Sequence, residues 1–490
     1  MKLVIPSIHY LAILPVLIFV GASLGLVLAS ALARGKVPLS VATSTVVAAA
    51  VASMVVNVFQ WRCVARAGAS TTVAHAIVLD DFSIVASGVI ALCVIMTALI
   101  AHDWAIAKRL TGVEFHILAL ASSAGALLMT QANDLIVIFL GLEILSIGLY
   151  VLAAFDRHRA TSSEAGLKYF LLGSFSSAIF IYGAALVYGA TGSTNLTTIS
   201  YFLGSNVVLR PGLLYAGGAL LLVGFAFKVA AVPFHQWSPD VYEGAPTPVT
   251  GLMASIVKVG AFAALIRVLI SALGTQLDTW RPIVFVLIVL TTVVGASLAL
   301  VQRNVKRMLA YSSINHAGFI LLGLWAGTIR GSAATLFYVI TYAPIVVATF
   351  AVATLVGGAG DDHHSIEHYQ GLARRQPWLG GAFAVLLLSQ LGVPLTTGFY
   401  AKYAVLASVL DAGGGALALI ALLSAAIAAF FYLRWTMALY SDDRLDGARI
   451  VVPTWTGIVI GFGVVLTIVF GVWPGPIATL AQHASVLFTP

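Results

Sequence analysis

Long apolar segments recur along almost the whole chain, and only short polar stretches separate them. Hydrophobic residues make up 60% of the 490 residues and charged residues only 9%, whereas soluble globular domains carry about 25% charged residues. A helix that crosses a bilayer needs about 20 mainly apolar residues. The sequence therefore predicts an all-α polytopic membrane protein. About fourteen segments have the length and composition of transmembrane helices: 8–31, 39–59, 82–101, 115–130, 132–153, 163–189, 212–233, 245–272, 281–301, 307–327, 332–356, 379–408, 413–438 and 453–474.

The first of these segments also shares features with a cleaved signal peptide. Lys2 precedes it, and Ala31-Leu32-Ala33 near its end resembles a cleavage site. The hydrophobic region of a signal peptide is about 7–15 residues long, and the apolar run here is longer. We therefore expect this segment to stay in the membrane as the first span.

Lysines and arginines are distributed unevenly between the predicted loops. The loops after odd-numbered spans hold Arg34, Lys36, Lys108, Arg109, Arg157, Arg159, Arg303, Lys306, Arg307, Arg374, Arg375, Arg444 and Arg449. The N-terminus and the loops after even-numbered spans hold the smaller set Lys2, Arg62, Arg66, Arg210, Arg281 and Arg330. Loops that are richer in lysine and arginine stay in the cytoplasm. This distribution predicts that both termini lie outside the cytoplasm.

A further group of charged residues lies inside the apolar segments themselves. Glu143 lies deep within LIVIFLGLEILSIGLYVL, and Lys228 lies within LLLVGFAFKVAAVP. A charge at the bilayer centre costs roughly 3 to more than 10 kcal/mol, and such residues typically mark transport paths. The predicted spans contain one central carboxylate and several lysines. Because burial disfavours the charged form of a lysine, we expect some of these lysines to be partly neutral.

Six ionisable residues are candidates for proton transfer: Glu143, Lys168, Lys228, His235, Lys258 and Lys402. We predict that Lys168, at the start of the sixth span, pairs directly with Glu143 on the fifth. His235 can pass a proton between lysines because histidine titrates near neutral pH. The alternative for each lysine is a permanently paired, structural ammonium group. For Lys168 the alternative is an interfacial side chain that reaches the membrane surface.

Three other ionisable residues lie within predicted spans. His316, in AYSSINHAGF, has two readings that stay open: a hydrogen-bonded histidine between helices, or a member of the transfer path beside hydroxyl groups that hold water. Arg267 and Arg434 cannot usefully lose a proton. We therefore expect structural or electrostatic roles for these two arginines.

Two apolar segments are interrupted by proline in a similar way. Residues 228–235 read KVAAVPFH, and residues 391–402 read LGVPLTTGFYAK. They fall in the seventh and twelfth predicted spans, and an offset of five helices inverts the second unit relative to the first. Paired broken helices are typical of the transport site in inverted-repeat proteins, although proline also kinks helices without any transport role. The predicted divisions are 1–110 for spans 1–3, 111–275 for a first repeat of spans 4–8, 276–440 for an inverted second repeat of spans 9–13, and 441–490 for the last span.

Signatures of metal, redox and nucleotide chemistry are lacking in the sequence. Cys63 and Cys93 are far apart, which argues against iron–sulfur or thiolate zinc ligation. His364 and His368 have i,i+4 spacing in a polar loop, but without companion ligands we do not expect a metal there. No Walker motif or Rossmann fingerprint with its acidic partner is present. We expect no cofactor on this chain.

The stretch PFHQWSPDVYEGAPTPV, residues 233–249, is long and distinctive. It closely resembles the central signature of the antiporter-like membrane subunits of respiratory complex I, the proton-translocating NADH–quinone oxidoreductase. Further matching pieces are LEILS at 142–146, LKYFLLGS at 167–174, VKRMLAYSSI at 305–314 and GVP at 392–394. The resemblance extends over most of the chain, from about residue 75 to about residue 440.

Within that family the sequence is most similar to the bacterial N-type subunits. YEGAPTP, followed by TGLMA and KVGAFAALIRV, fits the N type, whereas the L and M types usually carry histidine near that eighth helix. The family's proton-path residues are a glutamate on helix 5, lysines on helices 6, 7, 8 and 12, and a histidine after the helix-7 break. They match Glu143, Lys168, Lys228, Lys258, Lys402 and His235 one by one.

The resemblance implies a subunit that translocates protons across the bacterial cytoplasmic membrane. NADH oxidation and reduction of ubiquinone or menaquinone would occur in other subunits, which would hold the flavin and the iron–sulfur clusters. The implied partners are the antiporter-like M subunit, the small membrane subunits and the lipid bilayer, with no nucleic acid. Two alternatives remain: a subunit of an Mrp-type cation/proton antiporter, and a structural spacer in a membrane complex whose buried lysines are only paired.

Overall fold

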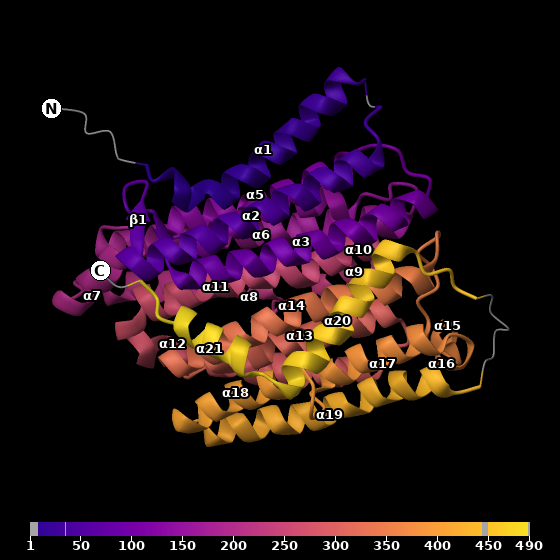
Figure 1. The fold of residues 1–490 in the computed structure, drawn as a ribbon. Coiled ribbons are helices and arrows are strands. Elements are labelled where there is room, and N and C mark those ends of the chain that lie inside the picture. Colours follow the sequence, from indigo (N-terminus) through magenta and orange to yellow (C-terminus); the bar gives the residue numbers. More distant parts are fainter. Residues whose placement is uncertain (1–7, 35, 443–448, 489–490) are drawn as a thin grey trace.

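The computed structural model describes residues 8–34, 36–442 and 449–488. Within these ranges the chain is a bundle of helices, most of whose long members run along one common direction, while α1 and α20 lie oblique to it (Figure 1). Lys2 and Arg444, which contribute to the predicted distribution of loop charges, lie outside the described residues. A short antiparallel hairpin, in which Ser70 pairs with Leu79, adds two strands that the sequence analysis does not predict.

The elements before the first break are α1 (Tyr10–Leu32), α2 (Leu39–Ala67), β1 (Ser70–Thr72), β2 (Ile77–Leu79), α3 (Asp81–Ala107), α4 (Glu114–Gln131), α5 (Leu135–Ala153), α6 (Ala160–Thr191), α7 (Leu196–Ser205) and α8 (Pro211–Val229). Between the two breaks lie α9 (Trp237–Gly244), α10 (Thr247–Leu252), the π-helix η1 (Met253–Val257), α11 (Lys258–Ile266), the π-helix η2 (Arg267–Ala272), the 3₁₀-helix η3 (Gly274–Gln276), α12 (Leu277–Leu300), α13 (Val305–Trp325), α14 (Ile329–Gly357), α15 (Ile366–Tyr369), α16 (Leu372–Arg375) and α17 (Pro377–Leu391). After the second break come α18 (Thr397–Asp411), α19 (Gly415–Tyr440), α20 (Thr454–Val472) and α21 (Gly475–Ala484).

Eleven helical stretches in the described ranges are long and apolar enough to cross a membrane. The three other predicted spans correspond to α4, α13 and the α17–α18 pair, which do not meet that criterion. The all-α polytopic architecture is therefore confirmed, whereas the number of fourteen crossings stays a prediction.

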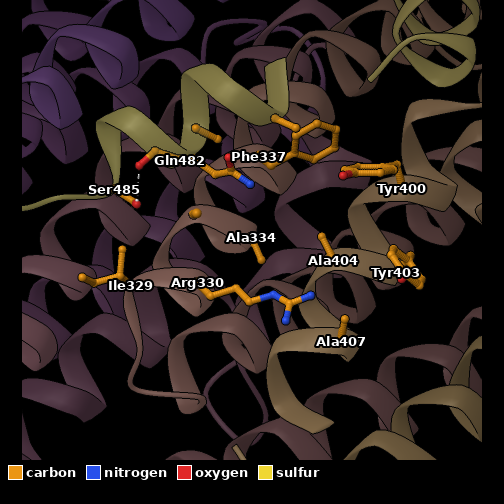
Figure 2. Close-up of a pocket in the computed structure, with 13 residues that line it drawn as sticks. Ile329, Arg330, Ala334, Phe337, Tyr400, Tyr403, Ala404, Ala407, Gln482 and Ser485 are labelled. Carbon is orange, nitrogen blue, oxygen red and sulfur yellow. Dashed lines mark hydrogen bonds between the residues drawn. The ribbon is translucent and has the colours of Figure 1, made fainter. Parts of the chain in front are cut away.

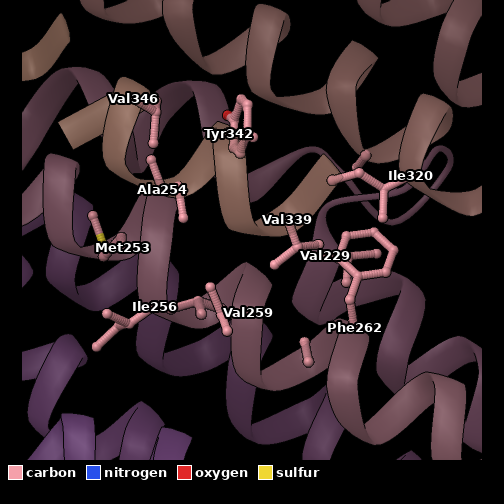
Figure 3. Packing of buried hydrophobic residues seen from close by; sticks show 14 of the residues in the cluster. Val229, Met253, Ala254, Ile256, Val259, Phe262, Ile320, Val339, Tyr342 and Val346 are labelled. Atoms are coloured by element: carbon pink, nitrogen blue, oxygen red, sulfur yellow. The ribbon is translucent and has the colours of Figure 1, made fainter. Parts of the chain in front are cut away.

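The centre of the bundle is formed by the α10–η2 stretch and by α14. In the most apolar part of the stretch 247–272, 94% of the residues are buried, and in that of α14 the share is 89%. In the most apolar part of α1 only 28% of the residues are buried. Figure 3 shows Met253, Ala254 and Val259 of the first stretch packed near Val339 and Val346 of α14. The peripheral helices expose many large apolar side chains, as a surface in contact with lipid requires.

Both predicted proline breaks are confirmed. α8 ends at Val229, the next residue adopts a left-handed conformation, and the chain turns through Pro233 before α9 begins. The Val232 N–H, freed by the break, donates to the Thr291 hydroxyl of α12 at 3.0 Å. α17 ends at Leu391 in the same manner, with Gly392 at φ +92°. In each case polar backbone groups are left at membrane depth without a continuous helix, which is tolerated only inside a protein or beside a polar cavity.

A buried ion pair connects the hairpin region to the centre of the bundle. Arg267, the first residue of η2, donates to both carboxylate oxygens of Asp80 at 2.7 and 3.0 Å. Asp80 also caps α3 by accepting from the Ser83 N–H at 2.9 Å. Burial alone would raise the pKa of Asp80, but the charge of Arg267 and these hydrogen bonds hold it below its usual value. The contacts of Arg267 agree with the structural role predicted for it.

Candidate functional site

Lys228 lies one residue before the end of α8, and its side chain is only 3% exposed. Its ammonium group donates to the Ser146 hydroxyl of α5 at 2.6 Å. It also lies 5.5 Å from the ring centre of Tyr169 and 6.0 Å from that of Tyr150. The charge is thus held by one hydroxyl and two aromatic faces, which stabilise a cation less strongly than a carboxylate does. This environment suits a group that gains and loses a proton.

Glu143 lies one helical turn before Ser146 on α5, on the side of α5 that meets α6. Its carboxylate accepts a hydrogen bond from the Ser177 hydroxyl of α6. Glu143 and Ser146, which binds Lys228, are thus neighbours on α5. Among the lysines predicted to transfer protons, the one whose charge interacts with Glu143 is Lys228.

The predicted direct pair of Lys168 with Glu143 is wrong in this structure. Lys168 forms ion pairs with Glu164 and with Asp240 of α9, each at 2.7 Å. On α6, Lys168 precedes Ser177 by nine residues, which at 1.5 Å per residue is roughly 13 Å along the helix axis. Lys168 thus lies at the end of the bundle, 41% exposed, while Glu143 lies deeper, at the level of Ser177.

Lys168 and its partners line a charged cleft of about 440 Å³ at that end of the bundle. Arg307 of α13 donates to Asp240 at 2.8 Å and to Glu243 at 2.9 Å. Asp240 is therefore shared by Lys168 of α6 and Arg307 of α13, which belong to different predicted repeats. Neither Asp240 nor Glu243 is among the residues that the sequence predicts to transfer protons.

Asp361 forms the inner wall of the same cleft. It pairs with Arg159 at 2.8 Å, with Lys306 at 3.3 Å and with His364 at 2.8 Å, and it accepts from the Thr247 hydroxyl. Burial alone would raise the pKa of Asp361, but Lys306, His364 and Thr247 hold it well below its usual value. Lys306 is completely buried, so Asp361 balances a charge that has no access to water.

The histidines of this loop make contacts other than metal ligation. His364 is bonded to Asp361, and His368 is bonded through Nδ1 to the Ser365 hydroxyl at 2.8 Å. Burial, the largest effect on His364, lowers its pKa below the usual value. Across the described ranges no group of three or more His, Cys, Asp or Glu side chains is arranged to hold a metal ion.

Lys258 is the first residue of α11, directly after the π-helical turn η1. It is 3% exposed and donates to the Ser313 carbonyl of α13, with its ammonium 5.5 Å from the ring centre of Tyr342. π-Helical turns are frequent at functional sites because they shift the register of side chains. The Ser313 hydroxyl in turn accepts from the Tyr342 hydroxyl at 3.1 Å.

His316 lies one turn after Ser313 on α13 and is buried. Its Nδ1 is bonded to the Tyr338 hydroxyl at 2.7 Å and its Nε2 to the Tyr432 hydroxyl at 3.0 Å. Lys402 of α18 is also buried; it donates to the Leu391 carbonyl at 2.7 Å. The Lys402 ammonium lies 4.9 Å from the ring centre of Phe319, one turn beyond His316. α13 thus carries three relevant residues in consecutive turns. They are Ser313, whose carbonyl binds Lys258, His316, which is hydrogen-bonded through both ring nitrogens, and Phe319, which the Lys402 ammonium approaches.

His235 differs from the lysines of the predicted site in that one of its ring nitrogens has no hydrogen-bond partner among the described residues. It follows Pro233 in the first break and is half-buried, and its Nδ1 is buried without a hydrogen-bond partner. No hydrogen bond among the described residues joins it to Lys228 or to Lys258. Arg434, in contrast, donates to the carbonyls of Leu300 and Gln302 at 2.8 and 2.6 Å, which agrees with a structural role.

A second cavity lies at the end of the bundle opposite the charged cleft. Figure 2 shows it between α14, α18 and α21, where Arg330, Tyr403 and Gln482 face a space of about 340 Å³. Arg330 pairs with Asp411 at its edge. Lys402 is not among the lining residues, because it lies on another face of α18 and turns toward Phe319.

The comparison with known proteins decides the family. Residues 132–428, more than half of the chain, match the family described as "NADH:quinone oxidoreductase/Mrp antiporter, TM". The chain belongs to the NADH:quinone oxidoreductase/Mrp antiporter family. The matched region of this family contains all six predicted site residues, from Glu143 to Lys402, together with His316 and both proline breaks.

Several family members called NADH-quinone oxidoreductase subunit N are similar to this chain. The protein of Parafrankia sp. is 44% identical over 375 residues, which are 76% of this chain and 71% of that protein. The protein of Rhodococcus opacus is 46% identical over 374 residues, or 76% and 69% of the two chains. The protein of Trichlorobacter lovleyi is 38% identical over 423 residues, or 85% and 86%. The predicted resemblance to N-type subunits is confirmed.

Several solved structures share the whole fold of this chain. A chain of respiratory complex I from Thermus thermophilus with bound aureothin is 33% identical, with a TM-score of 0.82 over 96% of this chain and 99% of that chain. A chain of the archaeal membrane-bound sulfane sulfur reductase is 26% identical, with a TM-score of 0.83 over 97% and 96%. A chain of the Mrp complex from Dietzia sp. has a TM-score of 0.82 over 97% and 96% at 20% identity, which shows a common fold alone.

Proposed function

We propose that this chain is an antiporter-like membrane-arm subunit of a bacterial NADH–quinone oxidoreductase and that it moves protons across the cytoplasmic membrane. The observation that carries the proposal is the set of three buried lysines, Lys228, Lys258 and Lys402, none of which is paired with a carboxylate among the described residues. A lysine kept only as a structural cation is normally paired with an acid when buried. The similarity to subunit N of several bacteria supports the same function.

The first part of the path consists of Glu143, Ser146 and Lys228. A proton on Lys228 is stabilised electrostatically by the carboxylate of Glu143. The Ser146 hydroxyl accepts from the Lys228 ammonium and donates to the Leu142 carbonyl of its own helix. When the charge at Glu143 changes, the free energy of holding a proton on Lys228 changes with it, because charges interact strongly where water is scarce. Glu143 thus acts as the control group and Lys228 as the carrier.

The second part of the path consists of Lys258, His316 and Lys402. The hydroxyls of Tyr338 and Tyr432 bond the two imidazole nitrogens of His316, and hydroxyl and imidazole groups both give and accept protons. His316 is thus placed to relay a proton between the two lysines that contact its helix on either side. No hydrogen bond between described side chains joins Lys228 to Lys258, so transfer between them uses bridging water. The half-buried His235 beside the first break is the histidine proposed to assist that step.

The charged cleft at the end of α6 is the proposed entrance. The loops around it are those that carry the excess of lysine and arginine, so the predicted orientation places the cleft on the cytoplasmic side. In the proposed mechanism Lys168 leaves its ion pairs with Glu164 and Asp240 and then contacts polar groups further inside the bundle. Its ion pairs are exposed and therefore individually weak, which suits a switch that opens and closes.

The proposed repeats divide these groups between two units. Residues 111–275 contribute Lys228 before the first break, and residues 276–440 contribute Lys402 after the second. Residues 1–110 and 441–490 flank them. The redox groups, namely NADH, flavin, iron–sulfur clusters and quinone, are assigned to partner subunits, and the neighbours of this chain are the M subunit and the small membrane subunits.

The test is Lys228→Ala in the assembled complex, studied in inverted membrane vesicles. The expected result is a loss of most of the NADH-driven acidification of the vesicle interior while the complex still assembles. Lys36→Ala, at an exposed position between α1 and α2, is the matched control and leaves acidification unchanged. Full acidification with Lys228→Ala would reject the proposal and favour a structural spacer.

An Mrp-type cation/proton antiporter subunit is the second candidate, because the same fold occurs in the Mrp complex. Sodium/proton exchange by vesicles that contain this chain, in the absence of NADH, would favour it. Co-purification of subunits that oxidise NADH would favour the first proposal.

A further inference from the structure

A groove between α17 and α20 is lined by none of the three buried lysines Lys228, Lys258 and Lys402. It has a volume of about 520 Å³. Its walls are apolar and come from both helices, with Leu379 and Ala382 on one side and Ile460 and Val464 on the other. The two helices pack against each other, so the groove follows their contact along the outside of the bundle.

Glycines on α20 keep this groove open. Gly457 and Gly461 stand one turn apart and both line it. No heavy atom lies within 4 Å of the position that a Cβ atom on Gly461 would occupy. A side chain at Gly461 would therefore enter the groove without a clash. The open space exists because neither helix supplies a side chain to fill it.

Polar groups line the groove at the end where both helices begin. Gln376 holds the backbone of Ile450 through two hydrogen bonds, of 2.6 and 3.0 Å. This contact fixes the neighbouring Arg449 at the mouth of the groove, where its guanidinium forms no hydrogen bond or ion pair with another described residue. Trp378, in the first turn of α17, is 93% exposed beside it. Exposed tryptophan and arginine together are typical of the membrane–water interface.

We propose that this groove binds an anionic phospholipid, with one acyl chain between α17 and α20 and the phosphate on Arg449. The groove is apolar along α17 and α20 and carries one arginine at the end where the two helices begin, a distribution of polarity that matches one acyl chain and its phosphate group. An acyl chain is narrow and apolar, like the walls. Arginine binds phosphate oxygens through paired N–H donors, and the predicted cytoplasmic leaflet is the one in which anionic lipids attract basic residues. The inference does not depend on the proposed proton transfer.

The experiment places the purified complex in phosphatidylethanolamine nanodiscs with a trace of phosphatidylglycerol that carries a photoreactive diazirine in its acyl chain. A phosphatidylcholine probe with the same acyl chain is the comparison. The expected result is several-fold more labelling by the phosphatidylglycerol probe on peptides that contain residues 377–382 and 457–465. Arg449→Ala lowers this labelling to the level of the phosphatidylcholine probe, and Gly461→Leu removes labelling by both probes.

Two matched variants control for general effects on the membrane surface. Arg62→Ala removes an exposed arginine from α2, and Gly25→Leu fills open space on α1; neither changes labelling of the groove. Equal labelling by the two probes with no effect of Arg449→Ala overturns the proposal. Labelling of neither groove peptide, with cross-links from them to a neighbouring subunit, overturns it as well, because the groove would then hold protein.

Discussion

Lys168 of α6 and Asp240 of α9 form an ion pair at 2.7 Å across the mouth of the charged cleft. The same carboxylate binds Arg307 of α13 at 2.8 Å. Asp240 thus connects α6, whose Ser177 binds Glu143, with α13, which carries His316. We therefore expect a change in the position of Lys168 to affect the contacts of Arg307 as well.

Asp240→Asn is expected to lower NADH-driven proton pumping more than Glu164→Gln does. Asp240 holds two cations from different helices, whereas Glu164 is 61% exposed and holds Lys168 alone. Exposed single ion pairs contribute only about 0.2–1 kcal/mol. The measurement is the initial rate of vesicle acidification, normalised to the rate of NADH oxidation. Equal effects of the two substitutions would contradict the proposed shared role of Asp240.

Ser146→Ala is expected to reduce pumping, because it removes the hydroxyl that binds the Lys228 ammonium at 2.6 Å. A buried group that loses its hydrogen-bond partner is destabilised by about 1–3 kcal/mol, and by more when it is charged. Ser146→Thr keeps the hydroxyl and retains pumping. Ser123→Ala is the control, since that buried hydroxyl binds a carbonyl of its own helix. A pumping rate for Ser146→Ala equal to that of Ser123→Ala would speak against the role of Ser146.

The two proline breaks could be predicted from the sequence because their cause is local. Pro233 lacks an N–H and removes a hydrogen bond from a helix that reaches it, and α8 ends four residues before it. Pro344, in contrast, lies inside the continuous helix α14, so a proline marks a candidate break.

The burial of Lys228, Lys258 and Lys402 could be predicted for a similar reason. A lysine near the middle of a membrane-spanning segment faces the interior of the bundle, because contact of its charge with lipid is strongly unfavourable. Lys168, at the start of its span, is instead 41% exposed, and Lys306, predicted in a loop, is completely buried.

The partners of these lysines could not be predicted, because they depend on packing between distant segments. Lys168 and Glu143 lie on adjacent helices, yet the depth of each along its helix decides whether they meet. Asp361 reaches Arg159 across 202 residues and Thr247 across 114. Nothing in the local sequence of the loop distinguishes Asp361 from the exposed Asp362 beside it.

Asp361→Asn is expected to destabilise the protein near neutral pH by roughly 3–5 kcal/mol, because it leaves the buried Lys306 ammonium without its carboxylate. The pKa of Asp361 lies below its ordinary value of 3.8. Its contribution is therefore fully present above that value and is lost only as the pH falls through the lowered pKa. Thermal unfolding of the purified complex should show a stability difference between wild type and variant that is constant from pH 5 to 8.

Asp362→Asn is the matched control for that experiment, since the Asp362 side chain is 67% exposed. It should leave the unfolding temperature unchanged over the same range. A difference for Asp361→Asn that already disappears between pH 6 and 5 would contradict the lowered pKa.

His316→Gln is expected to lower proton pumping by about tenfold or more, because a positioned proton donor and acceptor typically contributes at least that much to a transfer step. Glutamine can still hydrogen-bond to Tyr338 and Tyr432 but cannot take up a proton. His316→Lys, which restores a titratable group, should recover part of the rate. His116→Gln is the control, because His116 is also buried and bound to a hydroxyl, that of Thr43 at 3.0 Å, but lies on α4 away from the lysines. The measurement is the number of protons moved per NADH oxidised in vesicles. If His316→Gln and His116→Gln gave the same yield as wild type, His316 would be a packing residue and the link between Lys258 and Lys402 would have to run through water alone.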